Sequence, residues 1–329
     1  MVSVDGTPRP TKADVARLAN VSTATVSYVL NNAAGRSISP RTRETVHRAA
    51  KQLGYRPNLA ARNLARGGSG VVLYVMPRMA PGELPIEVGS RLTTALARRG
   101  IVHAVQFETE DDQNIVEAIA DLNPIAVTSL FPLTGTAAAA VEAAGVPQIH
   151  LGSGQLQEIG TLHLSVGEMR VDHLVSRGHS ALAFAYSGVT KWRPLGDYWL
   201  PGIRAAVGSR GLPEVAVDAV TAGDAADVVS GWVKGGVTAV CAQSDDTALV
   251  VLHGIRQAGL RCPEDLAVMG VDANTAGEVS APPLTTVAFD AHAIVELGVA
   301  VMMAELGYPE EEVESTAADI ATLICRAST

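Results

Sequence analysis

From residue 71 onward, short apolar runs alternate with longer stretches of helical periodicity, and this series occurs twice. Strands that alternate with helices favour a parallel sheet covered by helices on both faces, because each crossover helix packs on the sheet. Two such series predict two similar α/β lobes, with a ligand between them at the carboxyl ends of the strands. The expected strands are 71–76, 102–107, 125–130 and 148–151, then 181–186, 215–220, 238–242 and 266–271, with helices such as 198–210 and 245–258 in the second series.

Charge is distributed unevenly along the 329 residues, whose net charge is −9. Residues 1–70 hold 11 of the 25 Lys and Arg residues and only Asp5, Asp14 and Glu44 as acidic residues, so their formal charge is +8 and that of the rest is −17. This asymmetry predicts a basic head that binds a polyanion, on an acidic body. Chance clustering of the basic residues is the alternative.

The head has the start and stop signals of three short helices. Thr11 and Asp14 form a capping-box pattern at the start of the first helix, which halts at Asn20. Ser22 can cap a second helix over 23–30, and Ser39 with Pro40 begins a third that stops at Gly54. A helix, a tight turn and a second helix are typical of DNA-binding heads, although an ordinary three-helix bundle has the same signals.

The second helix is the candidate for insertion into the major groove of DNA, where residues near a helix N-terminus reach base edges. Its outward residues Thr23, Ala24 and Tyr28 are the candidates for base readout. Other polar residues of the head are candidates for hydrogen bonds to phosphate oxygens, which fix register without reading sequence. These are Thr11, Ser22, Thr25, Asn31, Tyr55 and Asn58.

A short helix after Pro57 and a Gly/Ser linker at 67–70 follow the head. This helix is too short to be stable alone in water, so we expect it to fold when it docks. Small Ala60 and Ala61 allow two such helices to pack closely, and Leu64 is a candidate wedge between base steps of the minor groove. Leu64 as an ordinary linker residue packed against the body is the alternative.

Residues 11–66, from TKADVARLANVSTATVSYVLNN to RPNLAARNLA, resemble the DNA-binding head of the lac repressor (LacI/GalR) family. The body carries similar motifs: HLVSRGH at 173–179, AVCAQSDDTAL at 239–249, LAVMGVDAN at 266–274, PPLTTVAFD at 282–290 and LICRAST at 323–329. The resemblance implies an all-α helix-turn-helix head over 1–56, a hinge helix and linker over 57–70, and a periplasmic-binding-protein-like body over 71–329. It implies an N-lobe of about 71–160 and 290–314 and a C-lobe of about 161–289 and 315–329.

The same resemblance implies a transcription regulator, expected to be a repressor, that binds a pseudo-palindromic double-stranded operator as a homodimer. Thr23, Ala24 and Tyr28 then occupy the specificity positions of the family, and Leu64 is the leucine inserted at the operator centre. A small-molecule effector, a sugar or a related metabolite, shifts operator affinity through the body. No cofactor and no metal are expected, and the direction of the response to the effector stays open.

The effector pocket is predicted by position. Asp272 matches the pocket Asp of the family, although an Asp that caps a loop is the alternative. Ser244 and Asp245 occupy positions of polar cleft residues, although Asp245 is also suited to cap the following helix. Arg193 is expected in a loop after 181–186, where it reaches an anionic or hydroxylated ligand or is simply solvated.

The sequence also departs from the family at this pocket. Trp199 stands where the family commonly has an Arg that pairs with the ligand, an acidic residue is missing at 152–154, and Pro77 with Arg78 replaces a small polar pair. An indole at 199 is suited to stacking on a sugar or a planar ring, or it fills the pocket. A degenerate or non-sugar effector site is therefore the alternative to a typical sugar site. In either case Arg78 and Trp199 are among the candidate effector-binding residues.

Cysteine content and the chain's first residues constrain location and class. Cys241, Cys262 and Cys325 lack a CxxC or His-paired spacing, which disfavours a disulfide framework and a zinc site and fits a reducing cytoplasm. The first twenty residues are too polar for a signal peptide, and no apolar run is long enough for a bilayer. A transport-type solute-binding protein is thus a remote alternative.

An enzyme is not expected, because adjacent Asp245 and Asp246 point about 100° apart on a helix and no catalytic motif accompanies them.

Overall fold

The computed structural model describes residues 10–30, 38–55, 69–76, 84–129, 132–150, 161–308, 315–316 and 320–329. By its internal contacts the chain divides into two compact units, Met1–Ser69 and Gly70–Thr329. We call the first unit the head and the second the body, and each is described by itself.

The head is built from α1 (Lys12–Ala19), α2 (Thr23–Leu30) and α3 (Pro40–Leu53). Thr11 and Asp14 form the predicted capping box, in which the Asp14 carboxylate accepts the Thr11 amide at 2.8 Å. The predicted stop of α3 at Gly54 is also present, with Gly54 at φ 63°, a value that favours glycine. The buried apolar side chains of the three helices form one small core: Val15, Ala16, Ala19, Val26, Val29, Val46, Ala49 and Ala50.

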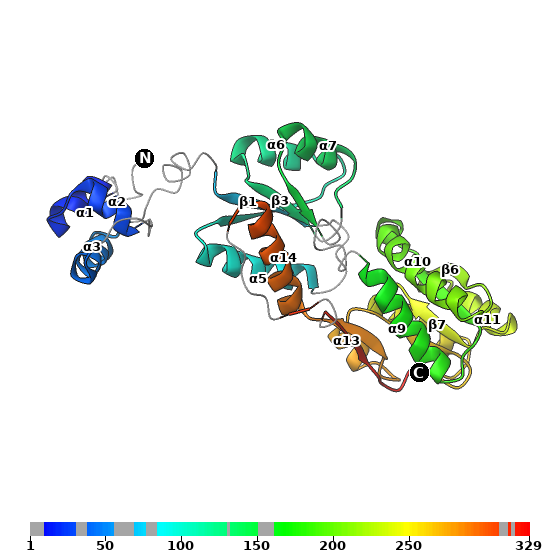
Figure 1. Ribbon diagram of the computed structural model, residues 1–329. Coiled ribbons are helices and arrows are strands. Elements are labelled where there is room, and N and C mark those ends of the chain that lie inside the picture. The colour runs from blue at the N-terminus through cyan, green and yellow to red at the C-terminus, as the bar shows by residue number, and fades with distance from the viewer. Residues whose placement is uncertain are drawn as a thin grey trace. The chain divides into compact units, whose positions relative to one another are not determined.

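The first sheet of the body is parallel, in the order β2-β1-β3-β4. Its strands are β1 (Val71–Met76), β2 (Val102–Phe107), β3 (Ala126–Ser129) and β4 (Gln148–His150). Alternate β1 residues face opposite layers: Leu73 and Val75 pack with α6 (Gln113–Leu122) and α7 (Gly135–Ala144), whereas Val72 and Tyr74 pack with α5 (Leu84–Arg98) and α14 (Ala291–Glu305). Figure 1 shows these helix pairs on opposite sides of the sheet. We call this sheet with its helices the first lobe.

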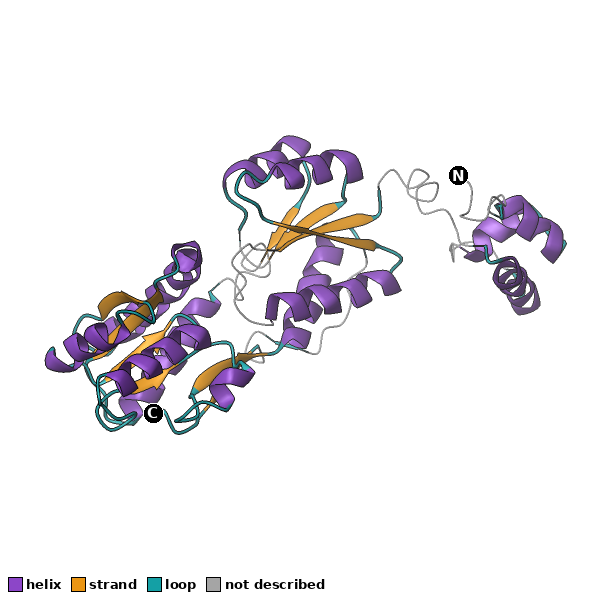
Figure 2. Ribbon diagram, turned by 180° about the vertical axis from the view of Figure 1, so that it is seen from behind, coloured by secondary structure: helices purple, strands orange, loops and turns teal. Residues whose placement is uncertain are grey.

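The second sheet is also parallel, in the order β6-β5-β7-β8. Its strands are β5 (Leu182–Ser187), β6 (Ala216–Val220), β7 (Ala239–Ala242) and β8 (Ala267–Met269). One face packs with α9 (Leu162–Ser176) and α10 (Arg193–Ser209), the other with α11 (Ala225–Lys234) and α12 (Asp245–Gln257). Figure 2 shows the strands sandwiched between helices. We call this sheet with its helices the second lobe.

Two further strands connect these parts of the chain. β9 (Thr286–Phe289) and β10 (Ala321–Ile324) pair antiparallel, with Phe289 opposite Ala321. α14 begins directly after β9, capped by Asp290, and packs on α5 of the first lobe. The chain end after β10 returns to the second lobe, where Val268 donates its amide to Ser328 at 2.8 Å.

The all-α head and the two parallel sheets covered on both faces confirm the predicted fold class. One local expectation is wrong: Arg193 does not lie in a loop but is the first residue of α10, which begins five residues before the predicted start. Pro194, at the start of this helix, accounts for the difference, because its fixed φ and missing N–H suit the first turn. No helix among the described residues has the length and apolarity needed to cross a membrane.

Candidate DNA-binding helix and effector edge

The second helix of the head presents its N-terminal residues outward. Val26 and Val29 of α2 are 0% and 2% exposed in the head core, and they anchor the helix on α1 and α3. On the rest of the helix surface, Thr23 and Ala24 are exposed and Tyr28 is half-buried. The structure therefore exposes two of the three candidate base readers and gives the third a partly covered ring.

Several candidate phosphate ligands already make contacts within the head. Ser22 accepts the Thr25 amide at 3.0 Å and its hydroxyl lies 2.9 Å from that of Thr25, which caps α2 as predicted. The Thr11 hydroxyl donates to Asp14, and this bond lowers the pKa of the Asp14 carboxyl. Tyr55 packs against the head core, and burial raises its pKa.

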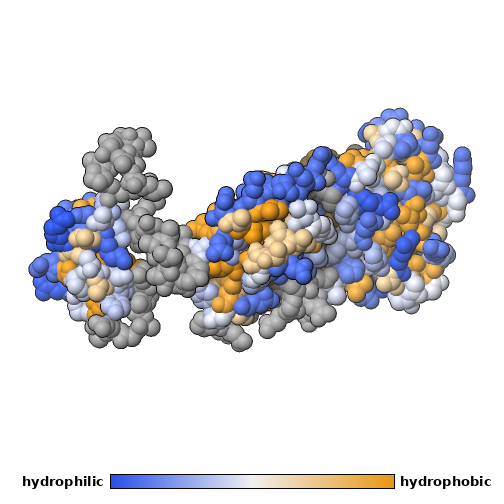
Figure 3. Space-filling model, turned by 90° about the horizontal axis from the view of Figure 1, so that it is seen from above, coloured by the Kyte–Doolittle hydropathy of each residue, from blue (hydrophilic) through white to orange (hydrophobic). Residues whose placement is uncertain are grey.

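The surface of the head carries the basic residues that the charge asymmetry predicted. Lys12, Arg17, Arg41, Arg48 and Lys51 are exposed on α1 and α3, and hydrophilic residues cover much of the described head in the view of Figure 3.

Four candidates for contacts with DNA lie outside the described residues: Asn31, Asn58, Ala61 and Leu64. Arg78 and the segment 152–154, named for the effector pocket, also lie outside them.

The candidate effector residues Ser244, Asp245 and Asp272 lie just beyond the carboxyl ends of β7 and β8, which are neighbours in the second sheet. We call these ends and the residues that follow them, 243–245 and 270–274, the effector edge. Ser244 is the N-cap of α12 and accepts the Thr247 amide at 3.2 Å. Parallel strands therefore bring together residues that lie 27 positions apart in sequence.

Asp245 is fully buried and connects three segments. Its carboxylate accepts the Asn274 amide at 2.8 Å and the Thr286 hydroxyl at 2.6 Å. The alternative that Asp245 caps α12 is wrong, because Ser244 has that role. Burial raises the pKa of Asp245, and the two hydrogen bonds and the charges of Arg170 and Arg326 oppose this rise.

Asp272 is half-buried, with a backbone φ of 115° that an L-residue adopts only with strain. Its amide donates to the Val287 carbonyl at 2.9 Å, but no hydrogen bond among described residues engages its carboxylate. Burial raises the pKa of this carboxyl well above its ordinary value, and the nearby Asp245 and Asp246 raise it further. The strained backbone and the unengaged carboxylate make Asp272 the strongest ligand candidate of the edge.

The side chain of Arg193 folds back on its own helix. Its guanidinium lies 3.9 Å from the centre of the Tyr186 ring, and its Nε donates to Asp197 at 3.1 Å. The Tyr186 hydroxyl donates to the same carboxylate at 2.7 Å. Arg193 is still largely exposed, so its position at the end of β5 leaves it accessible to solvent.

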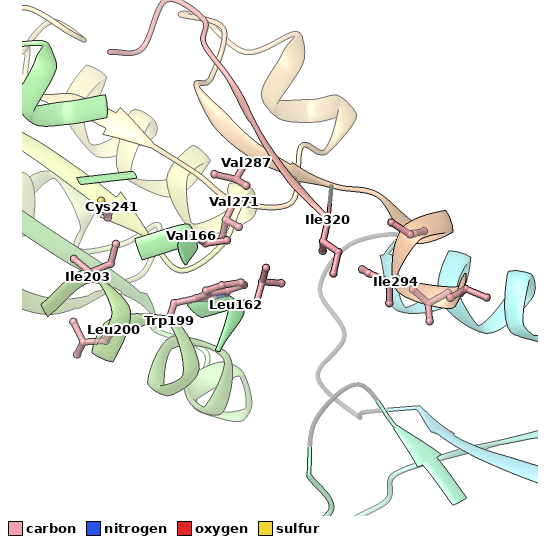
Figure 4. Close-up of a cluster of buried hydrophobic side chains, with 14 of the residues drawn as sticks. Leu162, Val166, Trp199, Leu200, Ile203, Cys241, Val271, Val287, Ile294 and Ile320 are labelled. Atoms are coloured by element: carbon pink, nitrogen blue, oxygen red, sulfur yellow. The ribbon is translucent and has the colours of Figure 1, made fainter. Parts of the chain in front are cut away.

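Trp199 is packed in the core instead of standing at the surface. Its side chain is 5% exposed, stacks on Phe289 and meets the edge of Tyr198, with ring centroids 5.8 Å and 4.8 Å apart. Figure 4 shows it beside Leu162 and below Val166 and Val271. The indole Nε1 has no hydrogen-bond partner among the described residues.

Sequence reasoning missed the residues that support the edge: Thr286, Asn274 and the fully buried Arg170 of α9. A signal for Arg170 was present, because it lies four residues after Val166 and four before Leu174, where the helical period calls for an apolar residue. The described residues contain no group of three or more His, Cys, Asp or Glu suited to hold a metal ion.

Comparisons with known proteins show which sequences this chain resembles. The family model described as "Bacterial regulatory proteins, lacI family" matches residues 11–58, and that of the "Periplasmic binding protein-like domain" matches residues 171–329. HTH-type transcriptional regulator CelR of Thermobifida fusca is 30% identical over 317 residues, which cover 85% of this chain and 86% of the relative. The lactose operon repressor of Escherichia coli is 29% identical over 297 residues, or 84% of this chain and 79% of that protein.

Solved structures resemble the whole chain. A lac repressor dimer bound to operator and the anti-inducer ONPF matches with a TM-score of 0.72 and 22% identity, over 98% of this chain and 99% of that chain. A complex of the transcriptional regulator CelR with cellobiose matches with a TM-score of 0.60 and 25% identity, over 98% of this chain and 100% of that chain. The first likeness concerns the fold alone, because its sequence identity is low.

Proposed function

Since the chain belongs to the lacI family of bacterial regulatory proteins, it is a DNA-binding transcription regulator, and we propose that it acts as a homodimeric repressor controlled by a small-molecule effector. Two heads would bind the two halves of a pseudo-palindromic operator. In this proposal the protein is a cytoplasmic regulator that associates with the nucleoid, and it is not an enzyme.

The observation that carries the proposal is the geometry of α2. Val26 and Val29 fix one face of the helix in the head core, and Thr23 and Ala24 are exposed at its N-terminal end. An α-helix held in this way fits the major groove with its first turn against base edges. Ala24 has no hydrogen-bonding side chain, so we propose that it contacts a thymine methyl group.

We propose the remaining head residues for positioning on DNA. Thr11, Ser22, Thr25, Asn31, Tyr55 and Asn58 would contact phosphates, and Ala61 and Leu64 of a hinge over 57–70 would enter the minor groove. The body over 71–329 would form an N-lobe of about 71–160 and 290–314 and a C-lobe of about 161–289 and 315–329.

For the effector we propose a sugar or a related hydroxylated metabolite, held at the effector edge by Asp272 with Ser244, Asp245 and Arg193. Carboxylate oxygens are suited to accept hydrogen bonds from neighbouring hydroxyls. The structure of CelR with cellobiose supports this class. The core packing of Trp199 against Phe289 favours the second candidate, a reduced or non-sugar site that the indole partly fills.

DNA binding is tested by footprinting the full chain on the region upstream of its own gene, against random DNA at physiological salt. We expect protection of a pseudo-palindromic site. Thr23→Ala should change the base preference at one position in each half-site, by about 1–3 kcal/mol per specific contact. Gln52→Ala, an exposed change at the end of α3, is the matched control. Protection no stronger than on random DNA would refute the proposal.

Effector binding is tested by thermal shift with panels of sugars and purines, followed by operator titration with each ligand that binds. Because linkage is reciprocal, a true effector changes operator affinity by the factor by which operator changes effector affinity. Asp272→Asn should abolish the shift, and Asp227→Asn, exposed on α11, should preserve it. A ligand that binds equally well to Asp272→Asn would place the site elsewhere.

A further inference from the structure

Arg170 is a fully buried cation in the second lobe. It lies in the middle of α9, one helical turn from the buried Val166 and Leu174, on the side that packs with α10 and the sheet. A guanidinium in such surroundings is costly unless it is hydrogen-bonded and balanced by negative charge. Its presence therefore calls for partners close by.

The hydrogen bonds of Arg170 go to the ends of two strands. Its Nη2 donates to the carbonyl of Ala242 at 2.6 Å and to that of Met269 at 3.1 Å. These are the last residues of β7 and β8, immediately before the effector edge. Neither Nε nor Nη1 has a hydrogen-bond partner among the described residues. Hydrogen bonds thus tie the two strand ends together but leave much of the buried charge to be balanced in another way.

The negative charge lies on the residues that follow those strand ends. The carboxylate of Asp245 packs so closely on Gly270, the residue after Met269, that a Cβ there would lie 2.0 Å from Asp245 Oδ1. The charge of Arg170 lowers the pKa values of Asp245 and Asp272, against the rise that burial causes. A single cation therefore acts on both candidate ligand carboxylates from the core side.

We propose that Arg170 is a positioning residue of the effector edge. It sets the separation of the β7 and β8 ends and supplies the buried positive charge that keeps Asp245 and Asp272 available as hydrogen-bond acceptors. The inference rests on the proposed effector function of this edge. It adds a residue that never touches the effector and acts through the two strands.

Other charged groups act on the same carboxylates. Asp246 raises the pKa of Asp272, and Arg326 lowers that of Asp245. Arg326 lies 3.9 Å from the exposed Glu278. The Cys241 thiol, which Arg170 also faces, has a pKa raised by burial. The variants below leave all of these groups in place. Their contributions to the stability of the fold therefore cancel when a variant is compared with wild type.

The test is urea unfolding of the full chain at several pH values for wild type, Arg170→Met and Arg170→Lys. When folding raises the pKa of a carboxyl, the free energy of unfolding of the protein falls as the pH rises from the unfolded pKa of that carboxyl toward its folded pKa. Removing the Arg170 charge extends this loss to higher pH. The decrease in the urea unfolding midpoint from wild type to Arg170→Met should therefore be at least about twofold larger near pH 8 than near pH 5. Arg170→Lys keeps the charge and should restore most of the wild-type pH dependence.

Two further variants keep the result interpretable. Arg210→Met changes the C-cap residue of α10, an arginine that pairs with Asp172 and Glu168. This variant should lower the urea midpoint slightly, by an amount that does not grow with pH. When Asp272 is also changed to Asn, the decrease in the urea midpoint caused by Arg170→Met should depend less on pH, because the two residues are coupled. If Arg170→Met does not fold, Arg170→Gln, which also removes the charge but keeps a hydrogen-bond donor, is compared with and without Asp272→Asn in the same way.

An equal midpoint loss at every pH, unaltered by Asp272→Asn, would overturn the proposal and leave Arg170 as a packing residue. These measurements use no effector. A chain that binds none of the sugars tested but shows the pH-dependent coupling would contradict the proposed effector and retain the role of Arg170.

Discussion

The indole of Trp199 stacks on the ring of Phe289, with ring centroids 5.8 Å apart and planes 13° from parallel. Trp199 belongs to α10 of the second lobe, and Phe289 is the last residue of β9, directly before the Asp290 cap of α14. The stack thus joins a helix beside the effector edge to the strand that leads into the first lobe. A change at Trp199 should affect both the packing and the response to an effector.

Trp199→Ala should lower the free energy of unfolding by about 3–5 kcal/mol, the usual cost of truncating a buried aromatic side chain. Trp199→Phe keeps an aromatic ring against Phe289 and should cost markedly less. Trp192→Ala removes a half-buried indole from the segment before α10 and is the matched control. Urea unfolding measures all three. Equal losses for Trp199→Ala and Trp192→Ala would show that the stack does not stabilise the fold.

Gly202→Ala should destabilise the second lobe by about 1–3 kcal/mol or more, through overpacking. A Cβ at Gly202 would lie 1.8 Å from the His163 carbonyl of α9, where backbone cannot yield. Gly208→Ala on the same helix meets open space and should instead stabilise by about 0.5–1 kcal/mol. Thermal or urea unfolding gives both values, and a neutral Gly202→Ala would show that α9 and α10 separate at little cost.

Thr11→Ala should destabilise the head by about 1 kcal/mol, because the hydroxyl accepts the Asp14 amide in the capping box. Thr11→Ser keeps the hydroxyl and should preserve most of this stability. Hydrogen exchange of the α1 amides in the full chain reports the change, with faster exchange in Thr11→Ala. The Asp14 pKa is lowered in the fold, so its contribution is present above pH 3.8 and is lost as the pH falls further. Unchanged α1 exchange would show that the cap is not needed.

Burial lowers the pKa of His103 to about 4, and its ring stacks on Tyr74 with Nδ1 2.7 Å from the Thr93 hydroxyl. The fold favours the neutral ring, so stability is full above pH 6.5 and falls as the pH drops toward 4. We expect this group to account for about 1–2 kcal/mol of acid destabilisation after solvent screening. His103→Gln should flatten that part of the unfolding profile, and His292→Gln, exposed on α14, should not. Identical acid profiles for wild type and His103→Gln would contradict the prediction.

Much of the fold could be predicted from the sequence because its signals are local. The Thr11 capping box and the Gly54 stop act within one helical turn, so the bounds of the head helices followed from neighbouring residues. The alternation of apolar runs and helices likewise predicted two parallel sheets with helices on both faces. The start of α10 at Arg193 differs from the predicted start at 198, because Pro194 is suited to the first turn of a helix.

The sequence by itself determined the head helices, the two sheets and the candidate residues Ser244, Asp245 and Asp272 after particular strands. Only the tertiary structure decided what those residues contact. Asp245 accepts from Asn274 and Thr286, which lie 29 and 41 residues away, and Arg170 reaches Met269 across 99 residues. Whether Trp199 stands open to a ligand or packs on Phe289 also depended on a distant strand. Such contacts arise when separate segments pack together, so no local pattern of residues carries them.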